Sequence, residues 1–152
     1  MNLQDLISTS IILLYVVSIT MYVITKNTYH IIVAFGIWGT AGLSEYVKHH
    51  IIKNRNPRPD GAYNCNMLCN NGDQAGKPGM PSSHAAASAF FMIMYWNYTT
   101  NPYVRAILLF YYLLILRSRY VKHCHSIPQL IVGSLVGAGT SSFLLKYMVR
   151  HL

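Results

Sequence analysis

Two histidines in this chain each lie next to residues that bind anions. His84 ends the string Gly-Met-Pro-Ser-Ser-His, and His125 follows Ser118 and Arg119 after five further residues. At both histidines a strongly apolar stretch meets a polar loop. A histidine can move protons or attack phosphorus, and serine and arginine donate hydrogen bonds to phosphate oxygens. The two strings therefore predict phosphate chemistry at a membrane surface.

The first histidine is expected at the start of a helix. Ser82 and Ser83 are favoured N-cap residues, and the alanines after His84 favour propagation of the helix. The free amides and the dipole of a first helical turn attract anions. We therefore expect Ser82 and Ser83 to help bind a phosphate within reach of His84.

The second histidine precedes another expected helix, which Ser126 can cap. Gln129 lies four residues after His125, so its amide oxygen could accept a hydrogen bond from Nδ1 and leave Nε2 free to attack phosphorus. Arg119, at the end of the preceding apolar stretch, offers a planar fork of donors to phosphate oxygens. We predict His125 as the nucleophile, with His123 as a less well spaced competitor.

Further cations crowd the polar segment that follows the second apolar stretch: Lys48, Lys53, Arg55 and Arg58. One or two of them could complete a cradle for phosphate, because phosphoryl transfer depends mainly on positioning and on positive charge around the equatorial oxygens. Glu45, three residues before Lys48, is expected to pair with it on one helical face.

The elements that must position these side chains are apolar helices. Of the 152 residues, 53% are hydrophobic and 11% are charged, whereas about a quarter of the residues in a typical soluble domain are charged. We predict an all-α, polytopic membrane helix bundle that forms a single domain over residues 1–152. Its transmembrane helices, about five in number, are expected at residues 7–25, 29–47, 84–100, 103–117 and 127–149.

The order of these stretches brings the two histidine strings together. If successive helices alternate in direction, loops 48–83 and 117–126 emerge on the same side as the N-terminus, with the C-terminus opposite. The formal net charge of +8 is assigned mainly to lysines and arginines that face lipid headgroups. Membrane lipid is therefore the expected partner, and nucleic acid is not.

The strings resemble the motifs of the type 2 phosphatidic acid phosphatase (PAP2) superfamily, whose pattern is K-x6-R-P, then P-S-G-H, then S-R-x5-H-x3-D. Residues 81–84 read Pro-Ser-Ser-His, and the third motif runs from Ser118 to Gln129. The chain departs from this pattern at two positions, with Ser83 in place of glycine and Gln129 in place of aspartate. At both positions it resembles the dolichyl-diphosphatase branch of that superfamily.

The first motif fits less well. Arg58 is followed by proline, as the pattern requires, but the residue seven positions before it is isoleucine. Lys48 and Arg55 keep the spacing, but asparagine follows Arg55. Either an insertion separates Lys48 from Arg58 or Arg55 takes its place, and we favour Arg58.

The resemblance implies a metal-independent phosphatase, with no cofactor, that removes the terminal phosphate of a polyprenyl diphosphate. His125 would form a phosphohistidine, His84 would protonate the leaving phosphate oxygen, and Gln129 would orient the nucleophile. The resemblance also implies a multi-pass protein of the endoplasmic reticulum membrane if the source is eukaryotic.

Several alternatives stay open on the sequence. The chain could hydrolyse lipid phosphates broadly. Because the aspartate is missing and the first motif is imperfect, it could also be a catalytically degenerate protein that binds anionic lipid as a scaffold. Cys65 and Cys69 share a loop and could form a disulfide. Gly133 and Gly137 are spaced for close helix packing, within the chain or in a homo-oligomer.

Overall fold

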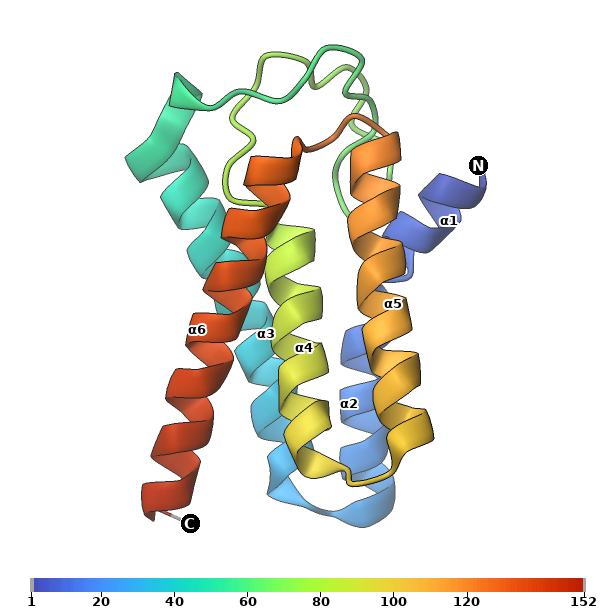
Figure 1. Cartoon of the computed structure of the whole chain (residues 1–152), viewed down its shortest axis with the longest axis vertical. Helices are drawn as coiled ribbons and strands as arrows, with labels where there is room; N and C mark the ends of the chain where they lie inside the picture. Colours follow the sequence, from blue (N-terminus) through green and yellow to red (C-terminus); the bar gives the residue numbers. More distant parts are fainter. Residues whose placement is uncertain (1, 152) are drawn as a thin grey trace.

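The computed structural model describes residues 2–151, with side chains to residue 148; residues 1 and 152, at the ends of the expected domain, lie outside the described residues. The described chain is all-helical, as predicted, and contains six α-helices and no strand (Figure 1). The helices are α1 (Leu3–Thr9), α2 (Ile12–Thr25), α3 (Thr28–Tyr46), α4 (Ser83–Tyr98), α5 (Pro102–Val121) and α6 (Ile127–His151). A π-helical segment (Val47–Ile52), a short 3₁₀ turn (Lys53–Arg55) and a long loop connect α3 to α4.

Capping side chains fix several of the helix starts. Asn27 and Asn101 accept hydrogen bonds from amides in the first turns of α3 and α5, and Asn2 forms a capping box at the start of α1. The predicted first helix, residues 7–25, is interrupted, because α1 and α2 are bent by 41° relative to one another. At the bend, the Ser10 hydroxyl donates to the carbonyl oxygen of Ile7 at 2.6 Å, a local bond that competes with regular helix.

Helix α4 lies at the centre of the bundle, with α3, α5 and α6 packed around it (Figure 1). Helix α6 approaches it closely because of two glycines. A Cβ atom on Gly133 would lie 2.4 Å from the Ser82 carbonyl oxygen, and one on Gly137 would lie 2.3 Å from that of Ala86. The glycine pair therefore packs helices within the chain, so the pair supports no contact between subunits.

The long loop and the α5–α6 loop cover one end of the bundle, and the N-terminal helix lies at that same end (Figure 1). Helix α6 runs away from it to the opposite end, as the alternation of helices predicted. A disulfide joins Cys65 of the long loop to Cys124 beside the α5–α6 turn. The pairing of Cys65 with Cys69, which the sequence left open, does not form, because Cys124 lies against Cys65 in the fold and Cys69 stays a free thiol.

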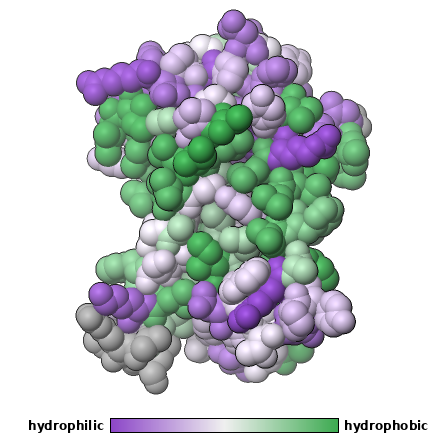
Figure 2. Space-filling view, in the orientation of Figure 1, coloured by the Kyte–Doolittle hydropathy of each residue, from purple (hydrophilic) through white to green (hydrophobic). Residues whose placement is uncertain are grey.

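Large apolar side chains face outward along the flank of the bundle. Trp38, Phe110 and Phe143 are 70%, 63% and 74% exposed, and hydrophobic residues cover much of the surface between two more hydrophilic ends (Figure 2). Among the described helices, α6 alone is long and apolar enough to cross a bilayer, over Ile127–Met148; α1 and α2 would supply a second span if they act as one broken helix. The remaining expected spans stay a prediction. These features are consistent with membrane association.

Candidate active site

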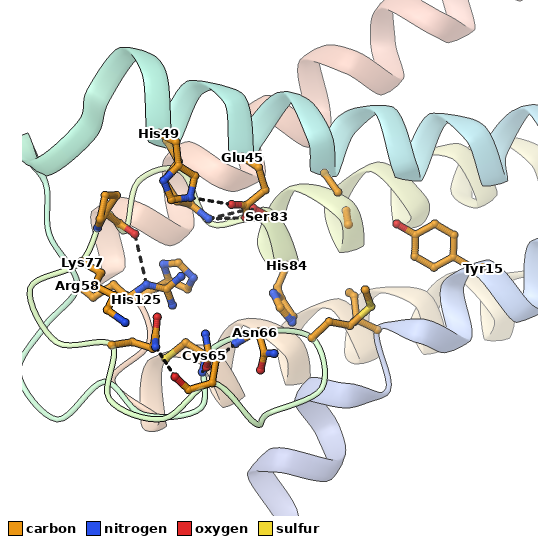
Figure 3. A pocket seen from close by; sticks show the side chains of 18 residues that line it. Tyr15, Glu45, His49, Arg58, Cys65, Asn66, Lys77, Ser83, His84 and His125 are labelled. Atoms are coloured by element: carbon orange, nitrogen blue, oxygen red, sulfur yellow. Dashed lines mark hydrogen bonds and ion pairs between the residues drawn. The ribbon is translucent and has the colours of Figure 1, made fainter.

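A pocket of about 400 Å³ opens beneath the long loop, at the end of the bundle where α3, α4 and the α5–α6 loop meet (Figure 3). It is lined by five of the residues predicted to take part in catalysis or phosphate binding: Lys48, Arg58, Ser83, His84 and His125. The fold therefore gathers both histidine strings and two of the candidate cations around one cavity, as predicted.

The first turn of α4 presents Ser83 and His84 to the pocket. Ser82 is the N-cap, and its hydroxyl accepts a hydrogen bond from the amide of Ala85 at 3.4 Å. Ser82 is fully buried and does not line the pocket, so its hydroxyl shapes the helix start and is not placed to contact a ligand in the pocket. Ser83 lines the pocket as expected.

His125 is held in the orientation that a nucleophile needs, but not by the expected partner. Its Nδ1–H donates to the carbonyl oxygen of Gly79 at 2.9 Å, and its side chain is almost completely buried. Because Nδ1 carries the proton in this bond, Nε2 keeps its lone pair. The Gly79 carbonyl therefore performs the orienting role that the sequence assigned to Gln129.

Gln129 instead caps the N-terminus of α6. Its Oε1 accepts the amide proton of Ser126 at 3.1 Å, which is one half of a capping box, and its Nε2 donates to Asn56 Oδ1 at 2.7 Å and to the carbonyl oxygen of Pro57 at 2.8 Å. The prediction that Gln129 bonds to His125 is wrong, because His125 precedes the helix and the four-residue spacing of a helix face does not apply across its start.

Gln129 still supports the position of His125 indirectly. A Cβ atom on Gly79 would lie 2.7 Å from Gln129 Nε2, so the peptide that orients His125 rests directly on this amide. The amide of Gly79 also donates to the carbonyl oxygen of Asn56 at 3.1 Å. Gly79, Asn56 and Gln129 thus form one network that positions His125. The Ser-x-x-Gln spacing of residues 126–129, a capping-box signature, is the sequence signal that could have revealed it.

Lys48 and Arg58 reach the same pocket although nine residues separate them in the chain. The π-helical segment takes up part of this length in widened turns, and it ends at Lys53, whose φ of 54° turns the chain away from the helix axis. The favoured choice of Arg58 over Arg55 agrees with their positions, because Arg55 is exposed and does not line the pocket. These positions agree with the alternative in which additional residues separate Lys48 from Arg58.

Arg119 lies behind the pocket wall instead of lining it. Its guanidinium is fully buried and donates to Ser8 Oγ at 2.5 Å and to the carbonyl oxygen of Cys65. These bonds tie α5 to α1 and to the disulfide-bonded loop. The expected fork to phosphate is therefore directed at the protein, and Arg119 acts on the pocket mainly through its charge.

Buried nitrogen atoms without a partner border the site. Within the described part of the chain, His84 Nε2, Arg58 Nη1 and Arg119 Nε are buried and make no hydrogen bond. Buried polar atoms are nearly always satisfied in folded proteins, and an unpaired donor is costly. An anion bound in the pocket would give His84 and Arg58 the acceptors that they lack.

Burial and neighbouring cations keep His125 neutral. The pKa of His125 lies well below its ordinary value, first because the imidazole is buried, and then because Arg119, Arg58 and Lys48 oppose a further positive charge. A neutral imidazole has the free lone pair that attack on phosphorus requires. In the free protein His125 therefore stays neutral to lower pH than an exposed histidine does.

The depressed pKa predicts how the acidic limb of activity should respond to a lost cation. Arg58→Gln removes one of the charges that lower the pKa of His125, so protonation and loss of the nucleophile should begin at higher pH. We expect the acidic limb of kcat/KM to move up by roughly half to one pH unit. Arg55→Gln makes the same charge change on an exposed residue. An equal movement in both variants would contradict a specific effect of Arg58.

Two features of the pocket went beyond what the sequence suggested. Glu45 was expected only to pair with Lys48, yet it also lines the cavity and accepts a hydrogen bond from Ser83. The Gly79 carbonyl carries no side-chain signal, and only its place in the Gly-Met-Pro-Ser-Ser-His string marked it.

The helical bundle and its cation-lined, two-histidine pocket suit a protein that binds a phosphoryl group. The model of the PAP2 superfamily matches residues 11–152, and the chain therefore belongs to that superfamily. Membership implies a phosphatase. No curated protein and no solved structure matched the chain, and the assignment to the dolichyl-diphosphatase branch stays a prediction.

Proposed function

We propose that the protein is a multi-pass membrane phosphatase that removes the terminal phosphate of a polyprenyl diphosphate through a phosphohistidine on His125. The observation that carries this proposal is the convergence of an oriented, neutral His125 with unpaired buried donors of His84 and Arg58 on one pocket. Such an arrangement binds a phosphate while leaving a nucleophile free to attack it.

In the first step Nε2 of His125 attacks the terminal phosphorus, and the bond from that phosphorus to the bridging oxygen breaks. This step requires a protonated His84, a form that the negative charge of the bound diphosphate favours. The imidazolium gives its proton to the bridging oxygen, so polyprenyl monophosphate leaves. In the second step His84 takes a proton from water, whose oxygen attacks the phosphohistidine and releases inorganic phosphate. Lys48 and Arg58 balance the negative charge on the equatorial oxygens in both steps.

The opposite side of the pocket suits an isoprenoid chain. Ile11, Tyr15, Ala41 and Ala87 line it between α2, α3 and α4, and Tyr15 lies beyond His84 from the charged residues (Figure 3). A substrate with its phosphates beside Arg58 would extend its tail along these side chains toward the apolar flank. The proposal therefore places the headgroup at the loop end and the tail among the helices of the bundle.

The test is phosphate release from farnesyl diphosphate by the detergent-purified chain in EDTA, with phosphatidic acid as the competing substrate. We expect turnover that EDTA does not reduce, and a kcat/KM for farnesyl diphosphate at least about tenfold above that for phosphatidic acid, a difference of about 1.4 kcal/mol. Preference for phosphatidic acid would instead identify a broad lipid phosphate phosphatase. Binding of both lipids without turnover would identify a degenerate lipid-binding protein.

A further inference from the structure

Glu45, at the end of α3, holds two of the groups that line the phosphate pocket. Its Oε1 accepts a hydrogen bond from Lys48 Nζ at 2.6 Å and another from Ser83 Oγ. Lys48 Nζ also donates to Ser83 Oγ at 3.1 Å, so the three side chains form a closed triangle on the pocket wall (Figure 3). Among the described residues that line the pocket, Glu45 carries the single carboxylate.

This triangle already contains an anion. The Ser83 hydroxyl directs its proton to Glu45, so it is not available as a donor to a ligand while that bond persists. A phosphate oxygen that entered beside Lys48 would compete with the carboxylate for the same two donors. Two anions close together in a partly enclosed pocket also repel each other.

The side chain of Glu45 has room to move away from Lys48 and Ser83. Its side chain is 50% exposed, whereas that of Lys48 is 2% exposed. The carboxylate can therefore swing toward solvent, where His49 Nε2 lies 3.3 Å from its other oxygen, while the lysine stays in the wall. The pocket thus contains a fixed cation and a displaceable anion.

We propose that Glu45 is a positioning residue that lowers the affinity of the site for free phosphate and so promotes the release of inorganic phosphate after each turnover. The inference rests on the proposed function. A polyprenyl diphosphate keeps the contacts of its second phosphate and its tail, whereas orthophosphate lacks these and depends more on the two donors for which Glu45 competes. Loss of the negative charge of Glu45 should therefore strengthen the binding of orthophosphate more than the binding of substrate.

The test compares binding of inorganic phosphate by the full detergent-solubilised wild-type chain and Glu45→Gln, measured by titration calorimetry. The variant keeps an oxygen that accepts from Lys48 but loses the charge. We expect its dissociation constant for phosphate to fall about tenfold, as removal of one close charge interaction allows. The inhibition constant of phosphate against farnesyl diphosphate should fall equally, and KM for farnesyl diphosphate should fall less than about threefold.

Three further variants keep the test decisive. Glu45→Asp keeps the charge and should bind phosphate more nearly as the wild type does. Glu45→Ala should behave as Glu45→Gln and replaces it if that variant does not fold. Asp73→Asn makes the same charge change on an exposed residue of the long loop, where the new amide oxygen can still accept from the amide of Ala75, and should leave phosphate binding unchanged.

Unchanged or weaker phosphate binding in Glu45→Gln overturns the proposal. Equal tightening in Asp73→Asn also overturns it, because the effect would then be one of net charge. If neither the wild type nor any variant binds phosphate, both the proposal for Glu45 and the assignment of the pocket as a phosphate site are overturned. Tighter binding in Glu45→Gln without turnover by any variant supports the competition at Lys48 and Ser83, but overturns the proposed function and with it the role of Glu45 in product release.

Discussion

His125→Asn should lower phosphate release from farnesyl diphosphate by at least about 10⁴-fold, because it removes the nucleophile on which both chemical steps depend. Asparagine can still donate a side-chain hydrogen bond toward the carbonyl oxygen of Gly79, the partner of His125 Nδ1. The helices and the loop should therefore be retained. The measurement is a turnover assay on the purified variant, with its thermal unfolding recorded beside that of the wild type.

His123→Asn is the matched control for this variant. His123 lies two residues away in the same loop, is exposed, and has a φ of 54°, a conformation that asparagine tolerates well. It should retain turnover within about twofold of the wild type, as expected for an exposed residue. A larger loss in His123→Asn than in His125→Asn would show that the nucleophile has been assigned to the wrong histidine.

His84→Asn should reduce turnover of farnesyl diphosphate by about 10² to 10⁴-fold, the range expected when a general acid is removed. Unlike loss of the nucleophile, this loss should depend on the leaving group. A leaving group that is stable as an anion needs no proton from His84. We therefore expect the defect to be at least about tenfold smaller for 4-nitrophenyl phosphate than for phenyl phosphate, since general-acid catalysis matters most for poor leaving groups.

The two aryl phosphates have nearly the same shape, so the comparison isolates the proton transfer from binding. His125→Asn serves as the reference, because loss of the nucleophile should reduce turnover of both esters alike. An equal defect of His84→Asn on both esters would remove His84 from the role of general acid and leave it a role in binding phosphate.

The fold was largely predictable because its helices are marked by apolar length and by capping residues. The expected stretches 29–47, 84–100 and 103–117 correspond closely to α3, α4 and α5, and Ser82 caps α4 as its residue type suggested. The break between α1 and α2 was not predictable in this way. It lies at the hydroxyl-rich run Ser8-Thr9-Ser10 inside the expected stretch 7–25, where a hydroxyl that bonds to a nearby carbonyl can compete with regular helix.

The sequence predicted which residues form the candidate site better than it predicted which partners their side chains contact. The histidines and Lys48 gather as expected because alternating helices bring their loops to one end of the bundle. The partners of Gln129 and Cys65 were missed for a shared reason. Each depends on tertiary neighbours, Asn56 in one case and Cys124 in the other. Spacing along the chain does not encode which distant segment comes to rest against a side chain, and the disulfide spans 59 residues.

The π-helical segment Val47–Ile52 has a consequence for how relatives of this chain can be recognised. Because its widened turns take up additional residues, we expect the spacing between Lys48 and Arg58 to differ among relatives while both cations still reach the same pocket. A pattern search that fixes this spacing would pass over chains built in the same way. A search that holds the two histidine motifs fixed and lets the first spacing vary would recover them.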